Sequence, residues 1–145
     1  MQLKRLRAAD LIRFKLIAIA SIFTGAVFFG WLFQPTKVID VHYSKKFDNY
    51  FVIVEHFPLT RNNKILWWEE NKSLFKEKYH VPIGECDYGI SFWVGNYKTD
   101  SGTDQDSDLL CFDEMNTKKN CIEKDHRPMK IWYRKDKNET IYLFN

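Results

Sequence analysis

The sequence predicts an α+β fold, in which an N-terminal single transmembrane helix is followed by a small antiparallel sheet packed with one amphipathic helix. Three observations lead to this prediction. Residues 16–33 carry no charged side chain, residues 62–79 space their apolar side chains as a helix does, and most other apolar residues fall in short strand-like runs. With 145 residues, of which 45% are hydrophobic, the chain has room for one compact domain and an appendage.

The uncharged run reads LIAIASIFTGAVFFGWLF. At about 1.5 Å per residue, a helix of this length comes close to crossing the ~30 Å hydrocarbon layer of a bilayer. Trp31 and Phe33 stand where interfacial aromatic side chains are expected, and Gln34-Pro35 ends the helix. A cleaved signal peptide is the alternative, but the run ends in bulky residues where a cleavage site needs small ones.

The basic charge of the chain is concentrated before this run. Residues 1–15 hold five Lys or Arg and one Asp, a net charge of +4, whereas residues 34–145 hold 17 basic and 18 acidic residues. The positive-inside rule therefore predicts that residues 1–15 form a cytoplasmic tail, that 16–33 span the membrane, and that 34–145 lie outside the cytoplasm. The nearly neutral outer domain gives no support for nucleic-acid binding.

The outer domain divides into short elements. Residues 37–43 and 50–57 have strand composition and form an antiparallel hairpin around a turn at 45–49. Asn62 or Asn63 can cap a helix that runs to about Tyr79. Residues 88–94 alternate as a strand does, and 96–108 form a polar loop. Further short strands are expected at 109–112, 120–123, 129–133 and 140–144, separated by Asn, Asp and Lys turns.

Trp67 and Trp68 on the predicted helix are the first candidates for binding a partner. Their spacing with Ile65, Phe75 and Tyr79 favours an amphipathic helix whose apolar face packs on the sheet. The alternative is an exposed aromatic platform at Trp67-Trp68.

The polar loop supplies the second group of candidates. Four carboxylates fall within nine residues: Asp100, Asp104, Asp106 and Asp108. Alternating Asp residues suggest calcium ligands, but Leu109 stands where an EF-hand loop needs glycine and Met115 where it needs the bidentate Glu. The sequence therefore favours a solvated acidic loop, which can also meet a basic partner through charge complementarity.

The three cysteines are Cys86, Cys111 and Cys121. The last two bracket a predicted hairpin, and opposed residues of paired strands lie near the separation that a disulfide requires. A Cys111–Cys121 bond is therefore favoured in an oxidising compartment. Pairing of Cys86 with either of the others, and three free thiols, remain alternatives.

The sequence contains no familiar catalytic motif. The histidines at 42, 56, 80 and 126 are scattered and form no HExxH. Gly89-Ile90-Ser91-Phe92-Trp93 begins like a nucleophile elbow, but Trp93 replaces the second glycine. CxxC, Walker A and dinucleotide fingerprints are also missing. We therefore expect no enzyme activity, no cofactor, no metal and no small-molecule substrate.

Several stretches together resemble the enterobacterial inner-membrane protein family grouped as domain of unknown function 943. They are Val38-Ile-Asp-Val-His42, Phe57-Pro-Leu-Thr60, Lys64-Ile-Leu-Trp-Trp-Glu-Glu-Asn-Lys72, Lys76-Glu-Lys-Tyr-His-Val-Pro82 and Leu110-Cys-Phe-Asp-Glu-Met-Asn-Thr-Lys-Lys-Asn-Cys-Ile122, after a basic tail and one apolar helix. The resemblance covers nearly the whole chain. It implies an inner-membrane anchor, a periplasmic domain and a Cys111–Cys121 pair, and it implies no catalytic residue.

These observations lead to a functional expectation. We expect a non-enzymatic single-pass inner-membrane protein whose periplasmic domain binds a protein partner, within that class an immunity protein against a delivered toxin. The alternative is an accessory subunit of a cell-envelope complex. An enzyme of unfamiliar type, with Asp and His residues converging from distant positions, is the third hypothesis.

Overall fold

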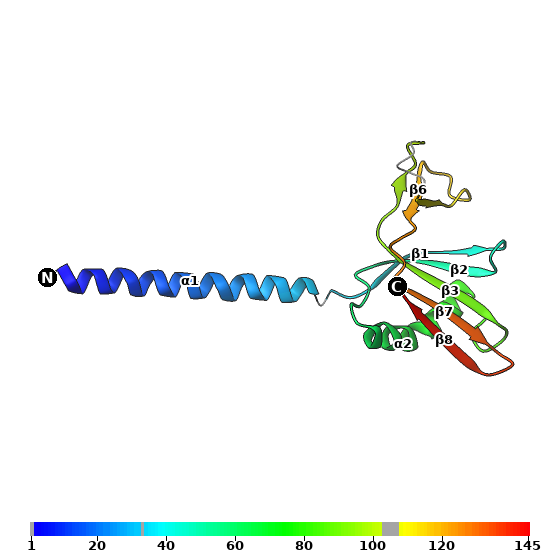
Figure 1. Cartoon of the computed structure of the whole chain (residues 1–145), viewed down its shortest axis with the longest axis horizontal. Coiled ribbons are helices and arrows are strands. Elements are labelled where there is room, and N and C mark those ends of the chain that lie inside the picture. Colours follow the sequence, from blue (N-terminus) through cyan, green and yellow to red (C-terminus); the bar gives the residue numbers. More distant parts are fainter. Residues whose placement is uncertain (1, 33, 103–107) are drawn as a thin grey trace. The chain divides into compact units, whose positions relative to one another are not determined.

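The structure is a computed structural model that describes residues 2–32, 34–102 and 108–145. It divides into two compact units, Met1–Pro35 and Thr36–Asn145. The first unit is the helix α1 (Gln2–Leu32), and the second holds the remaining helix and the strands (Figure 1).

Helix α1 is continuous through residues 16–32 of the apolar run. Within the described residues, one helix is long and apolar enough to cross a membrane, and it covers Asp10–Gly30 with a mean hydropathy of 1.8. Large apolar side chains along it are exposed; Phe14, for example, is 77% exposed. This candidate span begins and ends a few residues before the predicted 16–33. The side chains of Trp31 and Phe33, the predicted interfacial aromatics, lie outside the described part of the chain.

The second unit is built on a five-stranded sheet of order β1-β2-β3-β7-β8. Its strands are β1 (Lys37–Ser44), β2 (Asn49–Glu55), β3 (Tyr88–Val94), β7 (Met129–Arg134) and β8 (Glu139–Phe144). The predicted α+β class is confirmed. Strands β2 and β3 are parallel, however, and the predicted antiparallel sheet did not contain such a pair. The reason is that the helix between them carries the chain back before β3 begins, as in a βαβ unit.

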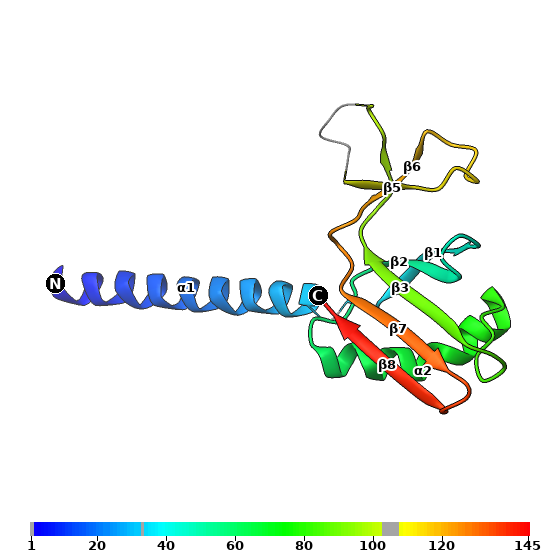
Figure 2. The ribbon, with the colours of Figure 1, turned by 45° about the vertical axis from the view of Figure 1, so that its right-hand side comes forward.

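That helix is α2 (Arg61–Tyr79), which packs on one face of the sheet (Figure 2). The predicted cap at Asn62 or Asn63 is wrong, because Thr60 is the N-cap and its Oγ1 accepts a hydrogen bond from the Asn63 N–H at 3.2 Å. His80, in the left-handed conformation with φ 54°, ends the helix. The core between helix and sheet includes Val52, Val54, Trp68, Phe75, Ile90, Phe92, Met129 and Ile131.

A second sheet of order β4-β6-β5 lies on the opposite face. It comprises β4 (Lys98–Thr99), β5 (Leu109–Cys111) and β6 (Lys119–Glu123), and we call residues 97–102 and 108–123 the hairpin module. Strand β4 falls within the segment predicted as a polar loop. The module packs Phe112 and Ile122 against Phe51, Ile53 and Trp93 of the large sheet. The large sheet is therefore covered on one face by α2 and partly on the other by the hairpin module.

Candidate functional site

The predicted aromatic platform on α2 belongs to the core. Trp68 is 1% exposed, and its ring lies 5.3 Å from Phe75 and 6.0 Å from Phe92, measured between ring centroids. Trp67 is partly buried, with its ring 5.4 Å from that of Phe57. The structure therefore favours packing over partner binding for this pair.

The predicted acidic loop is only partly described. Asp100 and Asp108 are exposed, whereas Asp104 and Asp106 lie outside the described residues. Asp100 Oδ1 accepts a hydrogen bond from the Gly102 N–H at 2.7 Å, which closes a local turn. The Asp100 carboxylate also lies within 4.8 Å of the sulfur atoms of Cys111 and Cys121. Because those sulfur atoms are at bonding distance from each other, they offer no thiolate pair to a metal.

The two hairpin cysteines face each other across β5 and β6. Cys111 pairs with Cys121 in the register of the two strands, and their Sγ atoms are 2.08 Å apart, a disulfide distance. Cys86 is exposed and unbonded. Of the alternatives left open by three cysteines, the structure favours the pair that closes the hairpin.

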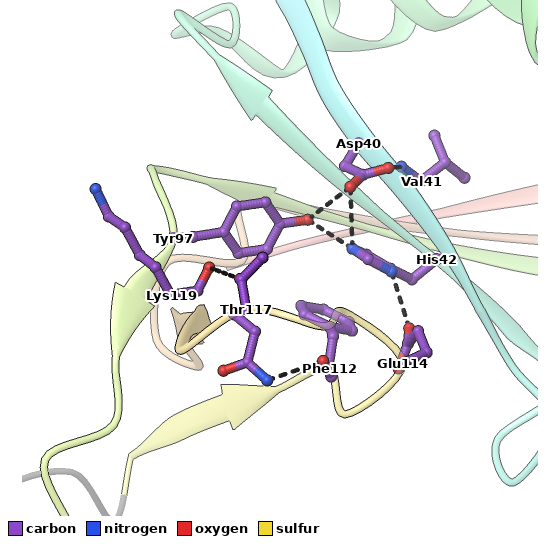
Figure 3. A network of polar contacts seen from close by, with 9 residues as sticks. Asp40, Val41, His42, Tyr97, Phe112, Glu114, Thr117 and Lys119 are labelled. Atoms are coloured by element: carbon purple, nitrogen blue, oxygen red, sulfur yellow. Dashed lines mark hydrogen bonds and ion pairs between the residues drawn. The ribbon is translucent and has the colours of Figure 1, made fainter.

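A polar network that sequence reasoning missed joins β1 to the hairpin module (Figure 3). At its centre is His42 on β1, which is 8% exposed and stacks on Phe112 with 3.9 Å between ring centroids. Its Nδ1 lies 2.9 Å from Glu114 Oε1, and its Nε2 lies 2.5 Å from the Tyr97 hydroxyl. The ring is therefore held by residues that follow it by 55 to 72 positions in the sequence.

Asp40 completes the network from the same strand as His42. Residues two apart on a strand point to the same side of the sheet, so Asp40 and His42 can meet one partner. The Tyr97 hydroxyl donates a hydrogen bond to Asp40 Oδ2 at 3.2 Å, and that oxygen lies 3.6 Å from His42 Nε2. Asp40 Oδ1 accepts a hydrogen bond from the Val41 N–H at 2.9 Å, which orients the carboxylate. The Asp40-x-His42 spacing was the one local signal in the sequence.

Tyr97 keeps its proton over the whole physiological range. Burial, and then the charge of Asp40 with its hydrogen bond, raise the pKa of Tyr97 well above the ordinary tyrosine value. Its hydroxyl therefore brings one proton to the network and can donate it to one acceptor at a time. The network as a whole contains a buried imidazole, a phenol and two carboxylates. The imidazole can bind a proton, and the carboxylates can compensate its positive charge.

The network borders a cleft of about 400 Å³ between the β1–β2 turn and the hairpin module. Two exposed aromatic side chains stand near its entrance: Tyr43 is 49% exposed and Phe47 is 56% exposed. The lining combines aromatic, basic and acidic side chains: His42, Tyr43, Ser44, Lys46, Phe47, Phe51, Leu110, Cys111, Phe112, Asp113 and Glu114. Aromatic side chains are enriched at protein interfaces, whereas Lys, Asp and Glu are depleted there, so the aromatic part of this lining is the part that suits a protein partner.

Comparison with protein families decides the classification. A family model described as "Enterobacterial putative membrane protein (DUF943)" matches residues 7–145. The chain belongs to this family. No curated protein and no solved structure matches it.

Membership of DUF943 confirms the resemblance found in the sequence. The family description agrees with the candidate span in α1, and the match continues through the whole second unit. Because the function of DUF943 proteins is unknown, no site residue transfers to this chain. The function must therefore be argued from the surfaces described above.

Proposed function

We propose that this DUF943 protein is a non-enzymatic binding protein of the inner membrane, with its second unit in the periplasm. The five basic residues among residues 1–15, at the N-terminal end of α1, and the near-neutral composition of residues 34–145 support this orientation. A Cys111–Cys121 pair at disulfide distance suits an oxidising compartment such as the periplasm. Residues 36–145 would then meet a protein partner outside the cytoplasm.

The turn aromatics, Tyr43 and Phe47, carry the proposal that the partner is a protein. Exposed aromatic side chains are enriched among the residues that dominate binding energies. Both rings are already supported in the free domain: the Tyr43 hydroxyl donates to Asp48 Oδ1 at 2.7 Å, and the rings lie 4.9 Å from Tyr50 and 6.3 Å from Phe51 respectively. A supported ring loses little conformational entropy when a partner covers it.

Within this class we propose an immunity protein that protects the cell from a toxin delivered by a neighbouring cell. A small outward-facing domain held at the inner membrane suits interception of such a toxin. Deleting the gene should stop growth of the strain in co-culture with cells that deliver the cognate toxin, and plasmid-borne protein should restore growth. Normal growth of the deletion strain with the toxin present would contradict the immunity role.

The proposed binding surface is tested in the same strain. The double variant Tyr43→Ala/Phe47→Ala should lose protection while its thermal unfolding midpoint changes little, because each residue is about half exposed and neither belongs to the buried core. Leu59→Ala is the control, since Leu59 is 75% exposed and lies outside the turn. Equal protection by both variants would show that the turn aromatics do not bind the partner.

One feature favours the alternative, an accessory subunit of an envelope complex. A groove along α1 is lined by small residues at Ala20, Ser21 and Gly25, and Ser21 Oγ bonds back to the Ile17 carbonyl at 2.9 Å. Small side chains let membrane helices approach closely. Replacing residues 10–30 with an unrelated span should abolish function under this alternative and leave an immunity protein active.

A further inference from the structure

The contacts around His42 require a definite number of protons. An ionised carboxylate only accepts hydrogen bonds, so the 2.9 Å contact between Glu114 Oε1 and His42 needs a proton on Nδ1. The contact between Tyr97 and Asp40 Oδ2 uses the single hydroxyl proton of Tyr97. The 2.5 Å contact between Tyr97 and His42 then needs a proton on Nε2. Three contacts therefore need three protons.

A neutral imidazole cannot satisfy this arrangement. It carries one N–H, which with the Tyr97 hydroxyl gives two protons for three contacts. The imidazolium ion carries two N–H groups and satisfies all three. The side chains of Asp40 and Glu114 are 43% and 59% exposed, so water can solvate both carboxylates.

We propose that His42 is a proton-binding site, and that the protonated ring fastens the hairpin module to β1. This assignment does not depend on the identity of the partner. One nitrogen bonds to Glu114 in the module, and the other bonds to Tyr97 at the base of the module beside Asp40 of β1. Loss of the proton leaves one of the three contacts without a donor, and because each contact joins the module to β1, the attachment of the module to the large sheet weakens.

The surroundings of His42 support a bound positive charge. The charged and titratable groups that face it are Asp40 on β1, Tyr97 before β4, and Glu114 after β5, with Asp113 and Lys46 farther out on the lining of the same cleft. A buried charge is tolerated where it is paired and hydrogen-bonded, and here two carboxylates compensate one imidazolium. The stacked Phe112 ring shields this pairing from water on one side.

The direction of the pH effect follows from the proton count. Histidine ordinarily changes charge near pH 6.5. The folded domain gains a hydrogen bond when His42 is charged, so the attachment is strongest in acid and weakens as the pH rises through the titration of the folded protein. A hydrogen bond to a charged group contributes about one power of ten in an equilibrium constant. We therefore expect the hairpin module to open about tenfold more often at pH 8.5 than at pH 5.5.

The first test is nitrogen-15 NMR of the histidine rings in the full chain in detergent micelles. As the pH is raised, both nitrogens of His42 should stay protonated to a pH about one unit higher than those of His56, in line with the tenfold effect on opening. His56 is exposed and serves as the internal reference. His126 is also exposed and bonds to Glu123, so it reports the effect of a single surface carboxylate. A His42 ring that loses its second proton at the same pH as His56, or at a lower one, would overturn the proposal.

A matched pair of variants tests the proton count itself. In Glu114→Gln the amide can donate to Nδ1, so a neutral ring satisfies all three contacts. His42 should then lose its second proton at a pH no higher than His56 does, and the β6 amides should keep the same hydrogen-exchange protection, corrected for intrinsic rates, from pH 5.5 to 8.5. Asp113→Asn removes the same charge one position away and should keep the wild-type behaviour. If Glu114→Gln leaves the protonation of His42 as in the wild type, or if wild-type protection does not change with pH, the proposal fails.

Discussion

Trp132 on β7 lies directly opposite Gly89 on β3, and its ring occupies the space that a side chain at Gly89 would need. A Cβ atom at Gly89 would come within 2.9 Å of the Trp132 ring and 2.3 Å of Asn49 Oδ1. An aromatic ring placed over a cross-strand glycine is a known way of stabilising a sheet that lacks a side chain. This relationship explains why a strand otherwise rich in aromatic and branched residues contains a glycine.

Gly89→Ala should therefore destabilise the domain by about 1–3 kcal/mol, because Asn49 and Trp132 must both move. Asn49 is 3% exposed and its Nδ2 donates to Ser91 Oγ at 3.1 Å, so it has little freedom to give way. Urea unfolding of the full chain in micelles, followed by tryptophan fluorescence, measures the loss. Leu143→Ala on the half-exposed side of β8 is the control and should change stability by less than about 0.5 kcal/mol. Equal effects would show that Gly89 is not constrained by its neighbours.

Trp68→Ala should cost about 3–5 kcal/mol of unfolding free energy, since it opens a large cavity between α2 and the sheet. Leu66→Ala on the same helix is the matched control, because Leu66 is 58% exposed and both Leu and Ala have high helix propensity. Urea unfolding distinguishes the two. A small change in unfolding free energy for Trp68→Ala would contradict the burial of this side chain and make Trp68 a candidate for binding a partner again.

The Cys111–Cys121 pair is predicted to be oxidised in the mature protein. Replacing both residues with serine should lower the unfolding free energy by about 2–4 kcal/mol, because the unfolded chain loses its closed loop. Cys86→Ser is the control and should have little effect, since Cys86 is exposed and unbonded. Mass spectrometry of non-reduced, alkylated protein should find Cys86 alone modified. Alkylation of all three cysteines would contradict the disulfide.

The domain should lose stability in alkali, as buried tyrosines are forced to ionise. Burial, followed by the charges of Tyr133 and Glu69, raises the pKa of Tyr88 to about 12, and burial also raises the pKa values of Tyr97 and Tyr142. A raised folded-state pKa favours the neutral form, so this stability is complete below pH 10 and is lost as the pH rises toward 12. Absorbance at 295 nm should show delayed tyrosinate formation in the folded chain relative to the chain in urea. Coincident titrations would contradict the burial of these rings.

Much of the fold could be predicted because local patterns determine it. Alternation between Tyr88 and Val94 located β3 and both of its faces, and the spacing of Trp68 and Phe75 identified the buried side of α2. The parallel pairing of β2 with β3 was missed, because it depends on how the chain crosses the sheet and not on the composition of either strand. The cap was misplaced because Thr60 follows a Pro-Leu turn and Asn62 and Asn63 have equally good capping chemistry.

The site could not be predicted in the same way. Asp40 and His42 lie two residues apart on β1 and point to the same side of the sheet. Their partners Tyr97 and Glu114 reach them only through the packing of the hairpin module. The acidic loop was predicted as a binding candidate because its carboxylates are close in sequence, but carboxylates of exposed loops often remain solvated. Residues that converge from different elements are invisible to spacing arguments, and the network of Figure 3 is such a case.

The proposal that residues 36–145 lie in the periplasm is tested most directly by thiol labelling in spheroplasts. Cys86 is an exposed free thiol in this unit, and Ala8→Cys places a second thiol in the basic tail. A membrane-impermeant maleimide should label Cys86 in intact spheroplasts, whereas a Cys86→Ser/Ala8→Cys variant should be labelled only after lysis. Labelling of Cys86 only after lysis would place the domain in the cytoplasm and contradict the proposed function.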